Sequence, residues 1–424
     1  GKYHPCLYFH QATGLKTLVH GDDFVSVGDR IAMAKFRKQL EKRFEIKTKV
    51  VGTAEGEDRE GKVLNRIIRV TEDGWEYEPD QRHAEMIVEE LGLQGAKPSV
   101  TPGEDEKKWE QEENEVPLEK DRASKFRSIA ARINYLAADR PDLMYSAKEA
   151  CRQMANPTEG GWKMVKRIGR YLVGRPRAVL KYEWQSRESP CMGFSDSDWA
   201  GCRKTAKSTS GGVIVRGTHF LKGWSRTQQC ITLSSAEAEL VAMCKLAAEL
   251  IGVLSMLKDL GEIQTGTVLA DSTAALAIAD RKGSGKLRHI NISLLWIQEK
   301  ESKEELAFEK VLGTENPADM MTKNLDSVKV QKFTSMLQQV FREGRSSQGL
   351  KMQRSGGADR GVIATVEQIA ATADESRIEG RAGTSRQPPM TSKQESKRAS
   401  TSKEDKDTRK PKHPKWPERT CGGF

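Results

Sequence analysis

Four acidic residues in the second half of the chain each stand at the expected end of a strand or helix: Asp196, Glu239, Asp271 and Asp319. A single acidic residue at such a point is usually a turn or cap residue. Carboxylates that converge repel one another, and cations relieve that repulsion. Two divalent ions about 4 Å apart can activate water and stabilise a leaving 3′ oxygen in phosphodiester hydrolysis. The four residues together therefore indicate a site for two Mg²⁺ ions, with Mn²⁺ as an alternative.

The choice of Glu239 over Glu237 rests on helix geometry. Residues two apart on a helix point to nearly opposite sides. The side of Glu239 is strongly apolar, with Ala242, Met243, Leu246, Leu250, Val253, Leu254 and Leu257. The side of Glu237 is less so, with Val241, Cys244 and Ala248. Because an apolar stripe packs on the core, Glu239 is expected to face the sheet and Glu237 to face away from it.

The elements that position these carboxylates follow from apolar periodicity. Three short strands come first, a long helix follows, and strands then alternate with helices. The expected strands are 191–195, 210–216, 219–225, 267–270 and 306–312, and the expected helices are 235–260, 273–280, 293–303 and one that begins near Pro317. This order predicts an α/β (α+β) fold with one mixed sheet covered by helices.

The first part of the chain carries a second acidic pair and a basic helix. Asp22 and Asp23 occupy the turn of an expected hairpin, and a helix at 31–44, a hairpin at 63–77 and a helix at 80–91 follow. Further helices are expected between 124 and 173. The last of them presents four cations that predict contact with nucleic-acid phosphates: Lys163, Lys166, Arg167 and Arg170. A solvated charged face on a packing helix is an equally good interpretation.

Composition limits the classes of protein. Hydrophobic residues make up 37% and charged residues 31% of the 424 residues, and the formal net charge is +10. Residues 344–424 hold +7 of that charge and few aromatic residues, so this tail is expected to be disordered.

The seven cysteines form no CxxC pair, which indicates a reduced, intracellular protein without structural zinc. No signal peptide and no run of about 18 apolar residues is present, so no membrane span is expected. The start at Gly1 favours a fragment of a longer polypeptide or an incomplete gene.

Seven short blocks follow one another between residues 194 and 323: Phe194-Ser-Asp-Ser-Asp-Trp-Ala-Gly201, Lys207-Ser-Thr-Ser-Gly-Gly212, Trp224-Ser-Arg-Thr-Gln228, Leu233-Ser-Ser-Ala-Glu-Ala-Glu-Leu240, Asp271-Ser-Thr-Ala-Ala275, Arg288-His-Ile290 and Ala318-Asp-Met-Met-Thr-Lys323. In content and order they resemble the ribonuclease H domain of copia-type retrotransposons. The resemblance implies a five-stranded mixed sheet with helices. It also implies that the metal ligands are Asp196, Glu239, Asp271 and Asp319. His289, where the family often has Lys-His-Ile, is a candidate for proton transfer.

The upstream part resembles the segment that joins reverse transcriptase to ribonuclease H in the same family, in the blocks Phe126-Arg-Ser-Ile-Ala130, Tyr135-Leu-Ala-Ala-Asp-Arg-Pro-Asp142, Asn156-Pro157 and Arg170-Tyr-Leu-Val-Gly174. His20-Gly-Asp-Asp23 is similar to the Tyr-x-Asp-Asp turn of the polymerase palm, which implies a metal-binding role for Asp22 and Asp23. The family's third aspartate and nucleotide-binding residues precede that turn and are absent from this sequence. Leu64-Asn65 stands where the family has Leu-Gly. Polymerase activity is therefore not expected from this chain alone.

These observations predict five regions: a partial reverse transcriptase palm and thumb (1–96), a linker (97–123), a helical connection (124–189), a ribonuclease H domain (190–343) and a disordered basic tail (344–424). The expected function is metal-dependent hydrolysis of the RNA strand of RNA–DNA hybrids by a retrotransposon Pol fragment. The rest of the Pol polyprotein is a further expected partner, and no membrane or small-molecule cofactor is expected. The expected location is the cytoplasm, in a virus-like particle, or the nucleus. A catalytically decayed, nucleic-acid-binding relic is the alternative, and the Ala318–Lys323 block disfavours an integrase or resolvase.

Overall fold

The computed structural model describes residues 1–104, 115–285 and 288–350. The strands are β1 (Leu7–His10), β2 (Leu15–His20), β3 (Asp23–Val27), β4 (Glu60–Val63), β5 (Arg66–Val70), β6 (Gly74–Glu78), β7 (Arg177–Glu183), β8 (Cys191–Ser197), β9 (Thr209–Arg216), β10 (His219–Thr227), β11 (Gly266–Ala270), β12 (Leu306–Lys310) and β13 (Gln339–Arg342). The α-helices are α1 (Arg30–Glu41), α2 (Arg82–Glu90), α3 (Lys120–Ala137), α4 (Met144–Arg152), α5 (Glu159–Gly174), α6 (Ser235–Asp259), α7 (Thr273–Asp280), α8 (Trp296–Ser302) and α9 (Ser327–Met336). Short 3₁₀ helices include η3 (Pro141–Leu143), η4 (Ile292–Leu295), η5 (Gly313–Glu315) and η6 (Pro317–Met321).

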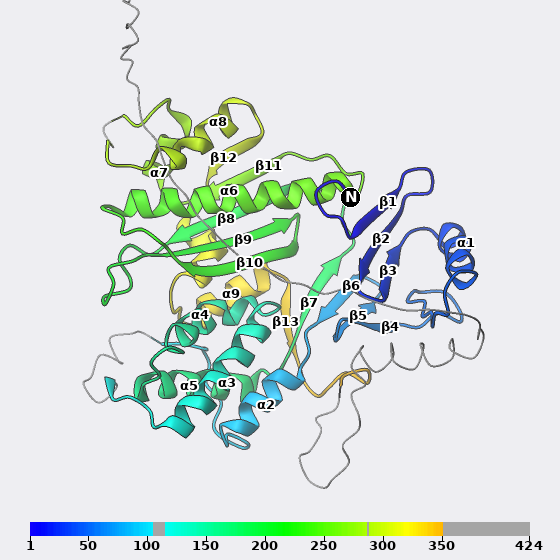
Figure 1. The fold of residues 1–424 in the computed structure, drawn as a ribbon, viewed down its shortest axis with the longest axis horizontal. Coiled ribbons are helices and arrows are strands. Elements are labelled where there is room, and N and C mark those ends of the chain that lie inside the picture. The colour runs from blue at the N-terminus through cyan, green and yellow to red at the C-terminus, as the bar shows by residue number, and fades with distance from the viewer. Residues whose placement is uncertain (105–114, 286–287, 351–424) are drawn as a thin grey trace, which may run out of the picture. The chain divides into compact units, whose positions relative to one another are not determined.

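The sheet that carries the acidic residues has the strand order β10-β9-β8-β11-β12 (Figure 1). β8 pairs antiparallel with β9 and parallel with β11, and β12 is parallel to β11. Parallel neighbours need crossover connections, which are usually helical. α6 lies on the path from β10 to β11, and α7 and α8 lie between β11 and β12. The α/β class and the five-stranded mixed sheet expected from the sequence are confirmed.

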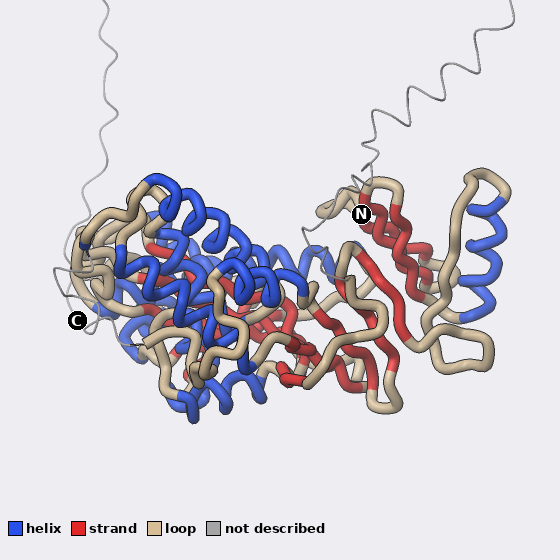
Figure 2. The backbone as a smooth tube through the Cα atoms, turned by 90° about the horizontal axis from the view of Figure 1, so that it is seen from below, coloured by secondary structure: helices blue, strands red, loops and turns tan. Residues whose placement is uncertain are grey.

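Helices cover both faces of this sheet. Side chains of β9 alternate between the faces: Val213 and Val215 join a buried cluster with α3 and α5, whereas Ile214 joins a second cluster with α6. α6 packs across β8, β9 and β11, and in Figure 2 the strands of this part run between helices. Burial on both faces explains why β9 is a continuous buried run rather than an alternating one.

Among the described helices, α6 is the one whose length and composition would allow it to cross a membrane. Here it is a core helix. Leu240, Met243, Leu246 and Leu250 are buried in the cluster that α6 forms with the sheet. The apolar composition of α6 is therefore accounted for by packing within the fold.

Two adjacent glycines of β9 bring other elements close to the sheet. A Cβ on Gly211 would lie 2.7 Å from Cβ of Met321 and 2.9 Å from the carbonyl oxygen of Ala318, both in η6. A Cβ on Gly212 would lie 2.1 Å from the ring of Trp224. Gly211 is the register partner of Asp196 on β8. The missing side chain of Gly211 therefore lets η6, which carries Asp319, approach the strand that carries Asp196.

A second five-stranded sheet, fully antiparallel, has the order β13-β7-β6-β5-β4. Its strands come from three of the predicted regions, 1–96, 124–189 and 190–343. β7 and β13 were not among the expected strands. The five domain boundaries stay predictions, but the shared sheet means that a fragment cut at residue 190 would lose β7 and leave β13 without its partner strand.

The end of the described chain differs from the expected single helix. The segment at Pro317 is the short 3₁₀ helix η6, and the regular helix α9 starts only at Ser327. The predicted disordered tail lies outside the described residues from 351 onward. Before that point Arg345 pairs with Glu85 of α2 at 2.5 Å, and the hydroxyl of Ser346 lies 3.3 Å from Nη2 of Arg69 on β5. Residues just after 344 are therefore anchored on α2 and on the second sheet.

Candidate metal centre

Three of the four predicted acidic residues converge on one point. Ligand oxygens of Asp196, Glu239 and Asp271 lie within 4.8 Å of one another. Asp196 is on β8, Asp271 directly follows β11, and Glu239 is in the first turns of α6. β8 and β11 are parallel neighbours, so their carboxyl ends meet at the same edge of the sheet. The parallel pairing thus brings together two aspartates that are 75 positions apart in the sequence.

The start of α6 separates the roles of its two glutamates. Ser234 caps the helix by accepting a hydrogen bond from the backbone N–H of Glu237 at 3.2 Å, and the Glu237 carboxylate accepts one from the backbone of Leu233 at 2.7 Å. This reciprocal arrangement resembles a capping box. Glu239 instead accepts a hydrogen bond from the backbone N–H of Ser197, at the end of β8, at 3.1 Å. Glu239 faces the sheet and Glu237 faces away from it, as helix geometry predicted.

Asp319 lies beside the three converging carboxylates and is paired with a lysine. Nζ of Lys323 is 2.8 Å from Oδ1 of Asp319 and 3.8 Å from Oδ2 of Asp196. The buried hydroxyl of Thr322 donates to the same Oδ2 of Asp196. Asn316, fully buried, fixes η6 to the sheet by donating to the carbonyl of Ser195 at 2.8 Å. These polar contacts hold Asp319 beside Asp196 at the end of β8.

The electrostatics of the cluster reflect crowded negative charge. Burial, together with Asp196 and Asp271, raises the pKa of Glu239 to about 9. Burial and Asp196 raise the pKa of Asp319 to about 6, while Lys323 opposes that shift. Burial and Asp196 also raise the pKa of Asp271. Without a cation, Glu239 therefore keeps a proton at neutral pH that an isolated carboxyl group would have released.

The donor set fits a hard divalent cation. Mg²⁺ and Mn²⁺ prefer carboxylate oxygens, and Oε2 of Glu239 is buried with no hydrogen-bond partner. A buried carboxylate oxygen without a partner is costly, and a cation bound by the cluster would satisfy it. Asp196, Glu239 and Asp271 are the residues that would hold it.

Glutamine at position 239 is expected to stabilise the metal-free protein at high pH. A glutamate in the unfolded chain titrates near 4.5, whereas the pKa of Glu239 in the folded protein is about 9. Between these values the folded state keeps a proton that the unfolded state has lost, so the free energy of unfolding falls as pH rises. Urea unfolding with chelator at about pH 5.5, 7 and 8.5 should show this fall in the wild type and in Glu237→Gln, but less of it in Glu239→Gln. Parallel pH profiles for the wild type and Glu239→Gln would contradict the raised pKa.

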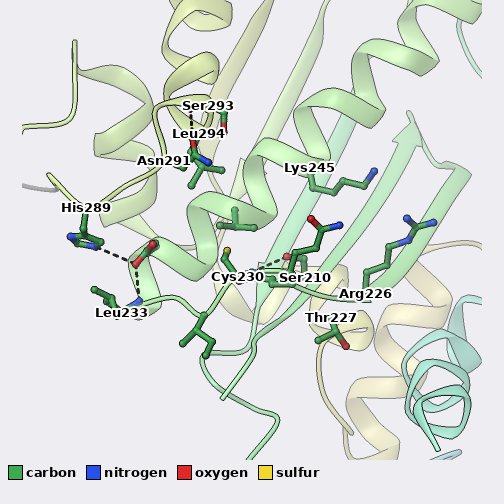
Figure 3. A pocket seen from close by; sticks show the side chains of 15 residues that line it. Ser210, Arg226, Thr227, Cys230, Leu233, Lys245, His289, Asn291, Ser293 and Leu294 are labelled. Carbon is green, nitrogen blue, oxygen red and sulfur yellow. Dashed lines mark hydrogen bonds and ion pairs between the residues drawn. The ribbon is translucent and has the colours of Figure 1, made fainter. Parts of the chain in front are cut away.

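A pocket of about 610 Å³ lies along the side of α6 that carries Glu237 and Lys245, and its lining includes both apolar and polar side chains. Figure 3 shows His289 at one side of it and Arg226 and Lys245 at the other. Nε2 of His289 is 3.3 Å from Oε2 of Glu237, the capping glutamate. His289 therefore lies with Glu237 in the pocket, and in the described part of the chain it makes no hydrogen bond or ion pair with the three converging carboxylates. A role for His289 in proton transfer stays a prediction.

Gln228 connects this pocket to the carboxylates. It lines the pocket, and its amide donates to the carbonyl of Ala238 at 2.9 Å and lies 3.3 Å from the Ser197 hydroxyl. The backbone N–H of Ser197 in turn donates to Glu239. The sequence analysis did not single out Gln228, Thr322, Lys323 or Asn316 as functional residues. The signal was present, because three of these four lie within blocks that carry the family resemblance.

The predicted polymerase ligands lie apart from such a cluster. Asp22 and Asp23 are exposed at the tight turn between β2 and β3. Within the described ranges, no third carboxylate, histidine or cysteine joins them in a group that could hold a metal ion. Their role as polymerase ligands stays a prediction.

The basic helix α5 is partly used for internal contacts. Arg167 pairs with Glu104 at 3.1 Å and donates to Thr101 at 2.9 Å, and Arg170 donates to the carbonyl of Lys97 at 2.9 Å. These two arginines hold the segment before residue 105 against α5. Lys163 and Lys166 are exposed on the same helix, and contact between this basic helix and nucleic-acid phosphates stays a prediction.

Comparison with known proteins identifies relatives of this chain. No family model matches the chain. It is 28% identical over 331 residues to the retrovirus-related Pol polyprotein from transposon TNT 1-94 of Nicotiana tabacum, a match that covers 75% of this chain and 24% of that protein. It is 29% identical over 215 residues to the corresponding polyprotein from transposon RE2 of Arabidopsis thaliana, covering 50% of this chain and 15% of that protein. An uncharacterized mitochondrial protein of Arabidopsis thaliana is 32% identical over 178 residues, or 40% of this chain and 68% of that protein.

A solved ribonuclease H1 isolated from compost matches 34% of this chain and 97% of its own length, with 17% identity and a TM-score of 0.26. The relationship rests on the sequence relatives. The homologues of this chain include retrovirus-related Pol polyproteins from copia-type transposons. The chain spans less than a quarter of the length of the Pol polyproteins that it matches.

Proposed function

We propose that this Pol-related chain hydrolyses the RNA strand of RNA–DNA hybrids with the help of two divalent cations. The convergence of Asp196, Glu239 and Asp271 within 4.8 Å at the end of a five-stranded mixed sheet carries the proposal. Structural ion pairs do not explain this cluster, because no lysine or arginine is paired with Glu239 or Asp271 among the described residues. Magnesium is the expected ion, with manganese as an alternative.

Each carboxylate has a distinct task in this proposal. Asp196 would serve both ions, since it belongs to the converging trio and also lies next to the Lys323 that pairs with Asp319. Glu239 and Asp271 would complete the first ion site, and Asp319 the second. Bound ions would supply an activated water and stabilise the leaving oxygen. The side chains themselves hold and orient those ions from rigid strand and helix ends.

The neighbouring pocket supports a nucleic-acid substrate. Arg226 and Lys245 provide positive charge, and Ser210, Gln228 and Asn291 provide hydrogen-bonding groups. Proteins distinguish RNA from DNA by contacts to the 2′-hydroxyl in the minor groove. A pocket with these groups, connected to Glu239 through Ser197, is suited to that task. We infer an intracellular site of action, in the cytoplasm or nucleus, and association with the remainder of a Pol polyprotein.

The direct test is cleavage of a labelled RNA–DNA hybrid by the full chain, with Mg²⁺ and with chelator. Magnesium-dependent cutting of the RNA strand alone is the expected result. Binding of the hybrid without cutting would point to a decayed, nucleic-acid-binding relic. The same chain should extend no primer, because the turn at Asp22 and Asp23 lacks a third carboxylate among the described residues.

Reversal of charge on α5 is expected to weaken binding of the hybrid. Lys163→Glu with Lys166→Glu should lower affinity and reduce the slope of log affinity against log salt by about 1–2, because each phosphate contact releases counterions. Lys35→Glu with Lys38→Glu makes the same change of charge on two exposed lysines of α1. Fluorescence anisotropy at several salt concentrations measures the affinity for the hybrid and its salt dependence for each pair of substitutions. Equal effects of the two pairs would mean that only net charge matters, and would remove α5 from the proposed interface.

A further inference from the structure

The four carboxylates of the proposed site are not equivalent. The ligand oxygens of Asp196, Glu239 and Asp271 converge on one point. Among the described residues, no lysine or arginine forms an ion pair with Glu239 or Asp271. Asp319 stands outside that group of three. Its Oδ1 is 2.8 Å from Nζ of Lys323, and the same Nζ is 3.8 Å from Oδ2 of Asp196. An ammonium group thus lies between the two carboxylates that would hold the second ion.

We propose that Lys323 is a resident cation of the second ion position, and that a divalent ion binds between Asp196 and Asp319 only after this side chain moves out. The proposal rests on the proposed two-ion function. It adds that the two ions bind with unequal affinity. The first position includes Glu239 and Asp271, which pair with no lysine or arginine among the described residues, whereas an ion at the second position must displace the ammonium of Lys323.

The surroundings of Lys323 allow this movement. Its side chain is 49% exposed, so the ammonium can be hydrated when it leaves, and a lysine has a long flexible stem. The preceding residue, Thr322, is fully buried and bonded to Asp196. The backbone at this point is therefore held while the side chain is free to change rotamer. A divalent ion carries twice the charge of the ammonium and interacts with the same oxygens, so displacement is favourable once its concentration is high enough.

Lys310 provides a matched control. It lies at the end of β12, and its charge also acts on Asp271. Its described hydrogen bond is to the hydroxyl of Thr273, not to a carboxylate of the cluster. Removal of Lys310 therefore changes the local field by the same one charge without opening a position between two ligands.

Isothermal titration calorimetry of Mn²⁺ binding to the full chain distinguishes displacement of Lys323 from a general change in local charge. It needs no assay of cleavage. The wild type should bind one ion tightly and a second more weakly. Lys323→Met should tighten the weaker site by about tenfold or more and the tighter site by less than about threefold. Lys310→Met should change both by less than about threefold, and Lys323→Arg, which keeps the charge, should leave the second site weak. Thermal melting of each variant with chelator checks that it is folded.

Two outcomes would overturn the role of Lys323 and leave the proposed function standing: two equally tight sites in the wild type, or equal tightening of both sites by Lys323→Met and Lys310→Met. Failure of a folded wild type to bind Mn²⁺ at all would instead remove the proposed function, and the role of Lys323 with it.

Discussion

Asp196→Asn is expected to abolish magnesium-dependent cleavage of an RNA–DNA hybrid, by roughly a thousandfold or more, while the protein stays folded. Asparagine keeps the size of the side chain and removes its charge. Asp196 belongs to the converging trio and also lies beside the Lys323 that pairs with Asp319, so its loss should weaken both ion positions. Among the described residues, no other carboxylate of the cluster has this double contact.

The same variant should be more stable than the wild type in the absence of metal. Asp196 raises the pKa of Glu239, Asp271 and Asp319, in each case after burial as the largest cause. Removal of its charge relieves that repulsion, so thermal melting with chelator should shift upward. A rise in stability combined with loss of activity distinguishes a ligand role from damage to the fold.

Asp198→Asn is the control for this experiment. Asp198 lies two residues further along the chain and accepts a hydrogen bond from the backbone of Thr209 rather than joining the cluster. Initial rates at saturating Mg²⁺ should fall far less in this variant. If Asp196→Asn kept cleavage within about tenfold of the wild type, the assigned centre would be wrong.

Asp142→Ala is expected to destabilise the protein by about 3–5 kcal/mol, because it leaves a buried arginine without its counter-charge. Arg140 donates to Asp142 at 2.8 and 2.6 Å, and both side chains are almost completely buried. Tyr171 donates to the same carboxylate at 2.9 Å and Gln339 at 2.6 Å. This network joins η3, α5 and β13, so its loss should be felt across the fold.

A double variant tests the physical reason. Arg140→Met with Asp142→Leu removes both charges and should be less destabilised than Asp142→Ala alone, in urea unfolding at neutral pH. The pKa of Asp142 in the folded state is lowered, against the opposing effect of burial, chiefly by Arg140. Its contribution to stability is therefore present above the unfolded value of 3.8 and is lost as pH falls through the lower folded value. If the double variant lost as much stability as Arg140→Met and Asp142→Leu lose in sum when measured singly, the pair would not be coupled.

The acidic cluster could be predicted from the sequence because its chemistry is concentrated at element ends. Asp196 and Asp271 follow apolar strands, and the stripe of α6 selects Glu239 over Glu237. The pairing of strands that are far apart in the sequence could not be predicted from local sequence patterns. β13 has only four residues and pairs with β7, more than 150 positions earlier, and nothing in its local pattern names that partner. Likewise Asp319 and Lys323 are four positions apart, a spacing typical of an ion pair on a helix surface. Nothing in that spacing indicates that the lysine also approaches Asp196.

The pairing of β13 with β7 also has a consequence for the order in which the protein is made. The second sheet starts with β4 at Glu60, but one of its edges stays unpaired until Gln339–Arg342 has been synthesised. Exposed strand edges invite pairing with other chains, and a domain cannot finish folding before its last strand leaves the ribosome. During translation the upstream sheet therefore presents the edge of β7 to the cell until nearly all of the folded part, with its acidic centre, has emerged.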